Sequence, residues 1–162
     1  MEVRKLTQKD DFTAVGSVFL RSFRTAYKGL LAPDYLQHLT PETWVPRLQQ
    51  KPEENWVVIE DHHYVGVASL TMRSGTSLRT AGELRALYVD PAYFRQGYGT
   101  VLMMAALADL RAQKYAEVYL WALADNLQAR KFYEHCHFTH DKDKMTKIGD
   151  QVVTLVRYRK TL

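Results

Sequence analysis

Two glycines separated by one residue, Gly97 and Gly99, have the clearest chemical meaning in this sequence. They follow an apolar run that ends at Asp90-Pro91, and they precede a second apolar run that starts at Thr100. Glycine lets a ligand approach the main chain, and the first turn of a helix carries unpaired N–H groups and a partial positive charge. The arrangement therefore predicts a loop that binds an anion such as pyrophosphate.

A short glycine loop also has other interpretations. It can be a strand-to-helix turn that binds nothing. A Rossmann dinucleotide site is disfavoured, because Met103 occupies the position of the third glycine in that fingerprint. The loop therefore needs independent support from another part of the chain.

A second candidate segment begins about thirty residues later, where Asp125 or Asn126 is typical of a helix N-cap. Ala129, Phe132 and Tyr133 then recur at spacings of three and four residues. This spacing places the three side chains on one face of the predicted helix.

The two segments together resemble a known family. Residues 126–138, NLQARKFYEHCHF, resemble the Asn-x-x-Ala-x-x-Phe-Tyr-x-x-x-Gly-Phe motif of the GNAT superfamily of N-acetyltransferases. Residues 96–99, QGYG, are similar to the pyrophosphate-binding loop of the same family, and both motifs stand in the family's order and separation. Residues 22–31 and 56–70 resemble the family's first helix and the hairpin before its cofactor strand.

The resemblance implies an α/β fold in one domain, residues 1–162. The sheet would be mixed, mostly antiparallel and twisted, with six to seven strands and with helices on both faces. Two central strands, around Glu83 to Asp90 and Val118 to Trp121, would form a parallel pair that splays apart. A right-handed crossover through the helix after Gly97 would join them.

The resemblance also implies that the chain binds acetyl-CoA as a cosubstrate. Leu87 and Val89 would pair through backbone groups with the pantetheine amides, and an N–H of the same stretch would stabilise the oxyanion. Asn126 would hydrogen-bond the pantetheine arm, cap its helix, or do both. The residues expected to bind the cosubstrate are Leu87, Tyr88, Val89, Arg95, Gln96, Gly97, Tyr98, Gly99, Thr100, Asn126 and Tyr133.

Two side chains are candidates for catalytic proton transfer. Acetyl transfer requires a neutral amine, yet a lysine-like amine has a pKa of about 10.4 and is protonated at neutral pH. Similar enzymes often place an acidic residue at the start of the cofactor strand, here Glu83, which would act as base through ordered water; a solvated or salt-bridged carboxylate is the alternative. Tyr133, aligned with the motif tyrosine, would protonate the leaving thiolate, unless it is only a packed core side chain.

Two positions depart from the family pattern. Phe94 stands where the family usually has Arg or Gln, three residues before the first glycine, and Arg95 follows one place later. His137 replaces the glycine that usually follows the second motif's helix. His137 must therefore adopt or avoid the left-handed conformation that glycine tolerates.

Composition limits the remaining function classes. With 162 residues, of which 46% are hydrophobic, the chain can form one globular core. The formal charge of +4 suits a polyanionic ligand such as coenzyme A, whereas the scattering of the basic residues argues against a nucleic-acid partner. The apolar runs are too short to span a bilayer, and the N-terminus lacks a signal-peptide core, so we expect a cytoplasmic protein with no membrane partner.

The cysteine and histidine residues predict no metal site. Cys136 is the only cysteine, so it forms no internal disulfide, which agrees with a reducing compartment. Neither His62-His63 nor the histidines around Cys136 have accepted zinc spacing, because no second ligand pair accompanies them. No metal cofactor is therefore expected.

The acceptor is predicted to be the primary amine of a small molecule. A protein N-terminus or lysine is an alternative, as is a non-catalytic acyl-CoA-binding module, and a homodimer is compatible with all three. In similar enzymes the acceptor pocket is walled by segments that correspond here to about Tyr27 to Trp44 and Asp141 to Gln151. Their side chains could hold an aliphatic or polycationic amine against carboxylates and aromatic faces, or the aromatic ones could be ordinary core. The side chains concerned are Tyr27, Asp34, Tyr35, Glu42 and Trp44.

The remaining segments give coarser predictions. Thr7 is predicted to cap a helix that runs from Asp10 to about Tyr27. Asp141 to Lys147 is predicted to be a charged loop, and the alternation in Gln151 to Arg159 predicts a final strand.

Overall fold

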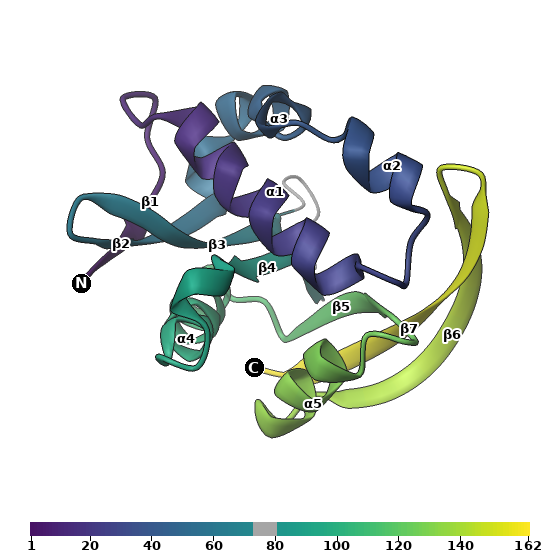
Figure 1. Ribbon diagram of the computed structural model, residues 1–162. Helices are drawn as coiled ribbons and strands as arrows, with labels where there is room; N and C mark the ends of the chain where they lie inside the picture. The colour runs from purple at the N-terminus through teal and green to yellow at the C-terminus, as the bar shows by residue number, and fades with distance from the viewer. Residues whose placement is uncertain (73–80) are drawn as a thin grey trace.

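The computed structural model describes residues 1–72 and 81–162, and in these residues the chain forms a mixed α/β fold (Figure 1). The strands are β1 (Glu2–Lys5), β2 (Asn55–Glu60), β3 (His63–Thr71), β4 (Ala81–Val89), β5 (Glu117–Leu123), β6 (Thr139–Ile148) and β7 (Gln151–Thr161). The α-helices are α1 (Phe12–Tyr27), α2 (Pro33–His38), α3 (Val45–Gln50), α4 (Tyr98–Ala112) and α5 (Leu127–His135). Three 3₁₀ turns complete the described elements: η1 (Pro41–Thr43), η2 (Pro52–Glu54) and η3 (Pro91–Tyr93).

The described strands form one sheet in the order β1-β2-β3-β4-β5-β7-β6. All neighbouring pairs are antiparallel except β4 and β5, which are parallel. The predicted mixed and mostly antiparallel sheet is therefore confirmed.

The sheet separates two hydrophobic cores, because successive side chains of a strand point to opposite faces. In β2, Val57 packs in the core beneath α1 and α3, whereas its neighbour Val58 packs in the core beneath α4 and α5. Figure 1 shows the same division, with α1 on one side of the sheet and α4 and α5 on the other. The prediction of helices on both faces is confirmed.

Two glycines let α4 lie close to the sheet. A Cβ on Gly66 of β3 would be 2.8 Å from a methyl carbon of Leu102, and one on Gly82 of β4 would be 2.6 Å from a methyl carbon of Leu110. Atoms this close must shift, so a side chain at either position would displace the packed leucine or the helix that carries it. The two glycines therefore help to set where α4, and with it the N-terminus of α4, meets β4.

The parallel strands β4 and β5 pair only at their first residues. Ala81, Gly82 and Glu83 pair with residues 117–119, and no ladder pair joins the two strands beyond Glu83 in the described chain. The predicted splay is therefore confirmed. From Leu84 to Val89, the edge of β4 that faces β5 has no strand beside it, which leaves its backbone accessible to a ligand.

Strand β4 contains a bulge within this splayed part. Ser69 of β3 pairs with Ala86, and Leu70 pairs with Leu84, so Arg85 is an extra residue without a partner on β3. Bulges change the direction of a side chain relative to regular alternation. The position of Arg85 could therefore not be derived from the pattern of the strand alone.

The start of α1 corrects the prediction that Thr7 is its N-cap. The cap is Asp11, whose side chain accepts a hydrogen bond from the Ala14 N–H at 2.9 Å. The Thr7 hydroxyl instead donates to Asp10 Oδ2 at 2.9 Å within a turn that precedes the helix. The prediction of Thr7 is wrong because Thr7, Asp10 and Asp11 all have side chains that can cap a helix. The turn formed by Thr7 and Asp10 places the first helical residue after Asp11, which therefore becomes the cap.

The prediction of a charged loop over Asp141 to Lys147 is wrong. This segment lies inside β6, which pairs with β7 along its length and forms an edge of the sheet. An edge strand with exposed faces tolerates charged side chains, because they stay in water while the backbone forms the ladder. The polar composition of residues 141–147 therefore led to the prediction of a loop where the chain forms a strand.

Candidate active site

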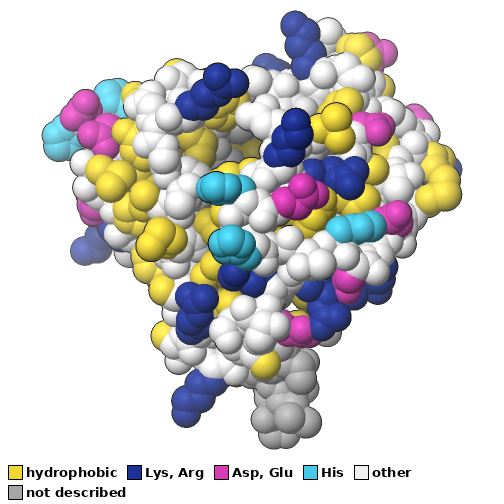
Figure 2. All heavy atoms as spheres, turned by 90° about the horizontal axis from the view of Figure 1, so that it is seen from below, with side chains coloured by type: hydrophobic (Ala, Val, Ile, Leu, Met, Phe, Trp, Pro, Cys, Tyr) yellow, Lys and Arg dark blue, Asp and Glu magenta, His cyan; other side chains and the backbone are white. Residues whose placement is uncertain are grey.

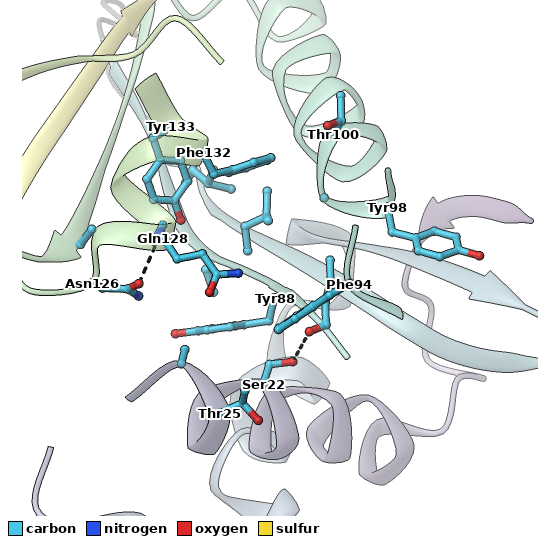
Figure 3. A pocket seen from close by; sticks show the side chains of 18 of the residues that line it. Ser22, Thr25, Tyr88, Phe94, Tyr98, Thr100, Asn126, Gln128, Phe132 and Tyr133 are labelled. Carbon is cyan, nitrogen blue, oxygen red and sulfur yellow. Dashed lines mark hydrogen bonds between the residues drawn. The ribbon is translucent and has the colours of Figure 1, made fainter. Parts of the chain in front are cut away.

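A cavity of about 360 Å³ lies where β4 and β5 diverge (Figure 3). Side chains and backbone from α1, β4, β5, α5 and the start of α4 line it, and its volume is typical of a small-molecule site. Of the eleven residues predicted to bind the cosubstrate, the structure brings all but Gln96 to this cavity. They are Leu87, Tyr88, Val89, Arg95, Gly97, Tyr98, Gly99, Thr100, Asn126 and Tyr133.

The N-terminus of α4 offers hydrogen-bond donors to this cavity. Helices α1 and α5 are each capped by a side-chain oxygen, whereas Gly97, the N-cap of α4, has no side chain to offer. Within residues 1–72 and 81–162, no backbone acceptor or side-chain cap receives the N–H groups of Tyr98, Gly99 and Thr100; the Val101 N–H is the first to bond, to the Gly97 carbonyl at 3.1 Å. An anion placed here would satisfy these donors and the positive end of the helix dipole.

The two glycines of the loop have different structural roles. Gly97 has a φ of 86°, in the left-handed region, and no heavy atom lies within 4 Å of a Cβ built on it. A Cβ on Gly99 would lie 3.5 Å from the ring of Phe132. Gly97 thus permits the turn and leaves space for a ligand. Gly99 lies where α4 meets α5, at a distance where a Cβ would make an ordinary contact.

The side chains around the glycines contribute unequally. Phe94 and Arg95 both line the cavity, and Arg95 is exposed, so a cation is available one residue after the position where the family has one. The side chain of Tyr98 points away from the cavity (Figure 3), which leaves only its backbone for ligand contact. The loop therefore offers mainly N–H groups and one guanidinium.

Tyr133 of α5 directs its hydroxyl into the cavity (Figure 3). Its ring packs against Phe132, Phe138 and Tyr158, with ring centroids 5.7, 6.1 and 6.2 Å away. Burial raises the pKa of the Tyr133 phenol well above its ordinary value, and no described residue receives its proton in a hydrogen bond. The phenol is therefore protonated at neutral pH and can donate to a group in the cavity.

Helix α1 supplies residues that the motifs did not indicate. The Ser22 hydroxyl donates to the Val89 carbonyl at 2.7 Å, and the hydroxyls of Tyr27 and Tyr88 lie 3.2 Å apart. Burial raises the pKa of both tyrosines, most strongly that of Tyr88. These contacts hold α1 against the splayed part of β4 and close one wall of the cavity.

Glu83, the candidate base, is not among the residues that line the cavity. It lies in the part of β4 that pairs with β5, and its Oε2 accepts a hydrogen bond from the Tyr119 hydroxyl at 3.4 Å. The structure therefore does not bring Glu83 together with Tyr133 and the glycine loop. A role as base would require a chain of water molecules, and it stays a prediction.

Asn126 is the N-cap of α5, because its Oδ1 accepts a hydrogen bond from the Ala129 N–H at 3.2 Å. Of the two capping candidates, Asn126 rather than Asp125 is therefore correct. Asn126 also lines the cavity, so the cap and a contact with a ligand are compatible. The contact with pantetheine stays a prediction.

The end of α5 shows how His137 replaces glycine. His137 adopts the left-handed conformation with a φ of 62°. Its N–H donates to the Glu134 carbonyl at 2.9 Å, and the Phe138 N–H donates to the Tyr133 carbonyl at 3.0 Å. This is a Schellman motif, and the Tyr133–Phe138 ring contact is its usual hydrophobic partner.

We expect His137→Gly to stabilise the protein by about 0.5–1 kcal/mol, because the relief of left-handed strain exceeds the entropy that glycine gains in the unfolded chain. The melting temperature should rise by about 1–4 °C. His135→Gly, in the last turn of the same helix, is the matched control and should destabilise the protein by roughly 0.3–0.5 kcal/mol. Thermal unfolding of both variants checks this, and a loss of stability in His137→Gly would contradict it.

Most of the residues proposed for the acceptor pocket lie elsewhere. Tyr27 lines the cavity, but Trp44 stacks on Phe19 at a centroid distance of 5.4 Å. Tyr35 packs in a third hydrophobic cluster with α2 and the β6–β7 hairpin. The carboxylates of Asp34 and Glu42 are exposed and do not line the cavity, so they offer no support for binding a polycationic amine there. Sequence reasoning missed Ser22, Arg85, Trp121 and Gln128, which do line it.

Two other kinds of functional feature are absent from the described ranges 1–72 and 81–162. No group of three or more His, Cys, Asp or Glu side chains there is placed to hold a metal ion. No helix in the same ranges is long and apolar enough to cross a membrane. On the face shown in Figure 2, basic side chains are dispersed among acidic, histidine and apolar ones.

Comparisons with known proteins agree with the motifs. Over 112 residues the chain is 31% identical to a mycothiol acetyltransferase of Beutenbergia cavernae; the match covers 69% of this chain and 35% of that relative. The structure resembles a PaiA N-acetyltransferase of Thermoplasma acidophilum in complex with coenzyme A (TM-score 0.72, 19% identity, 96% of both chains). It also resembles a ribosomal-protein-alanine N-acetyltransferase of Brucella melitensis (TM-score 0.77, 18% identity, 100% of both chains). The model of the acetyltransferase (GNAT) family matches residues 19–138, and the chain therefore belongs to this family.

Proposed function

We propose that the protein transfers the acetyl group of acetyl-CoA to a primary amine of a small molecule, by direct attack in a ternary complex. The observation that carries this proposal is that one cavity receives both the unbonded N–H groups at the start of α4 and the hydroxyl of Tyr133. The first feature suits a pyrophosphate, and the second suits the leaving group of a thioester. Family membership supports the same reaction.

The pyrophosphate would accept hydrogen bonds from the N–H groups of Gly99 and Thr100, next to the Arg95 guanidinium. The pantetheine arm would lie along the open edge of β4 from Leu87 to Val89, where it takes the place of the missing strand. This would place the thioester between the splayed strands, near Tyr133. An N–H of the same β4 edge would stabilise the oxyanion.

In the transfer, the amine nitrogen forms a bond to the acetyl carbon and the carbon–sulfur bond breaks. The amine loses a proton to a chain of water molecules. Glu83, our candidate base, accepts the proton from this chain and releases it to solvent. Tyr133 donates its proton to the departing thiolate and regains one from water. The strongly raised pKa of Tyr133 keeps this proton in place throughout the neutral range.

Thiol release from acetyl-CoA, measured against a panel of amines, tests the proposal. The panel should contain polyamines, aminoglycosides, amino acids and short peptides, and acetyl-CoA binding should be measured by calorimetry on the same sample. Release that depends on a small amine supports the proposal. Release with peptides alone would point to a protein acceptor, and tight binding without any release would point to a non-catalytic acyl-CoA-binding module.

A further inference from the structure

Cations surround an aromatic ring at the edge of the cavity. Trp121 of β5 lines the cavity, and the Nζ of Lys144 lies 3.9 Å from the centroid of its ring. The Nζ of Lys142 and the guanidinium of Arg157 lie 5.7 and 5.9 Å from rings of the same side chain. The pairing of Trp121 with Arg157, and of Arg157 with Lys142, places these side chains on one face of the sheet.

The other strand of the splay adds a further cation. Arg85, the bulge residue of β4, lines the same cavity and is exposed. Loss of hydration, and then the nearby charge of Arg47, lower the pKa of the Arg85 guanidinium, and the charges of Glu83 and Glu54 only partly oppose this shift. An arginine nevertheless remains protonated at neutral pH. Arg85 therefore carries its charge in a setting that favours an added anion.

Three of these four cations form no salt bridge in the part of the chain that the structure describes. Arg157 forms a salt bridge with Asp141. In contrast, no salt bridge joins Arg85, Lys142 or Lys144 to a carboxylate within residues 1–72 and 81–162. Residues 73–80 contain no Asp or Glu, so that segment brings no carboxylate either.

Cations beside a cavity that form no salt bridge attract anions and repel other cations. The planar guanidinium of Arg85 presents two parallel donors that match a carboxylate. The same positive field lowers the pKa of an amine bound nearby and so increases its neutral, nucleophilic fraction. The positive field would therefore weaken the binding of a polycationic acceptor. An amine that also carries a negative group would bind more tightly, and its amine would be more often neutral.

We infer that the acceptor is an amino-acid-like molecule, an amine that also carries a carboxylate, and that Arg85 binds this carboxylate while Lys144 adds to the positive field. The inference rests on the proposed acetyl transfer and narrows its substrate class. It replaces the carboxylate-lined pocket that the sequence predicted.

The test compares acceptors that differ only in charge. The rate of thiol release is measured with amino acids, with their carboxamides, with the decarboxylated amines and with an amino-phosphate such as phosphoethanolamine. We expect kcat/KM to be about 10- to 100-fold higher for a carboxylate than for its carboxamide, the range expected for hydrogen bonds to a charged group. In Arg85→Met this ratio should fall to near one, and Arg85→Lys should restore part of it. Arg111→Met, which removes an exposed arginine on α4, should keep the wild-type ratio.

The outcomes separate this inference from the proposed function. Faster transfer to neutral amines, to polyamines or to the amino-phosphate overturns the inference and leaves the acetyltransferase intact. If no amine supports thiol release, titration of the same acceptors into the protein with and without coenzyme A decides the inference independently. Binding of the amino acid that is lost in Arg85→Met supports it, and equal binding of acid and carboxamide overturns it.

Discussion

We expect Gly97→Glu to weaken acetyl-CoA binding by more than about 100-fold, which corresponds to about 2.7 kcal/mol. Two effects add in this variant. The new carboxylate enters the open space in front of the α4 N-terminus and competes for the N–H groups that the pyrophosphate would use. A side chain at a φ of 86° also strains the turn that presents these groups.

Gly29→Glu is the matched control for this experiment. Gly29 also has a positive φ, 79°, and a Cβ there meets nothing within 4 Å, but it does not line the cavity. Calorimetric titration with acetyl-CoA should therefore give the wild-type affinity for this variant, and circular dichroism should show that both variants are folded. Equal affinities of the two variants for acetyl-CoA would contradict the prediction that the Gly97 loop binds the cosubstrate.

The second large effect is expected for Tyr133→Phe, which should lower kcat by about 100-fold or more while the affinity for acetyl-CoA stays close to that of the wild type. The ring still packs against Phe132 and Phe138, so only the proton donor is lost. Because the phenol pKa is raised, its proton is present at any pH below that raised value. Loss of the Tyr133 proton should therefore not limit the rate in assays between about pH 6 and pH 9.

Tyr158→Phe is the control for this substitution. Tyr158 contacts the ring of Tyr133, but its hydroxyl donates to Glu134 at 2.7 Å and it does not line the cavity. Its removal should lower the melting temperature and leave the turnover of the folded enzyme unchanged. If Tyr133→Phe turned over as fast as this control, Tyr133 would not be the acid.

The sequence predicted those parts of the site that depend on local main-chain geometry. A strand, a turn with Gly97, and the helix after it are specified by neighbouring residues, so the anion-binding loop could be placed from its spacing. The face of α5 that carries Phe132 and Tyr133 follows from helical periodicity alone. The family motif then connected these two segments across the fold.

Features that depend on register between strands could not be predicted in this way. Arg85 faces the cavity at a bulge, and a bulge depends on how β3 pairs with β4. Glu83 was expected at the site, but the splay begins only after it, and the point of separation depends on the pairing with β5. The part of strand β6 from Asp141 to Lys147 was predicted as a loop, because its charged side chains are typical of a loop until β7 provides a partner.

The short ladder between β4 and β5 divides the sheet into two hydrogen-bonded halves. One half contains β1 to β4 and the other β5 to β7, and in the described chain three residue pairs form the strand ladder between them. A cosubstrate that lies in the gap would act as the strand that joins the halves. The folded population would then depend on the supply of cosubstrate, and the protein would gain about 1.4 kcal/mol of stability for each tenfold excess over the dissociation constant. In a cell with little acetyl-CoA, most of this enzyme would be without cosubstrate and would therefore be at its least stable.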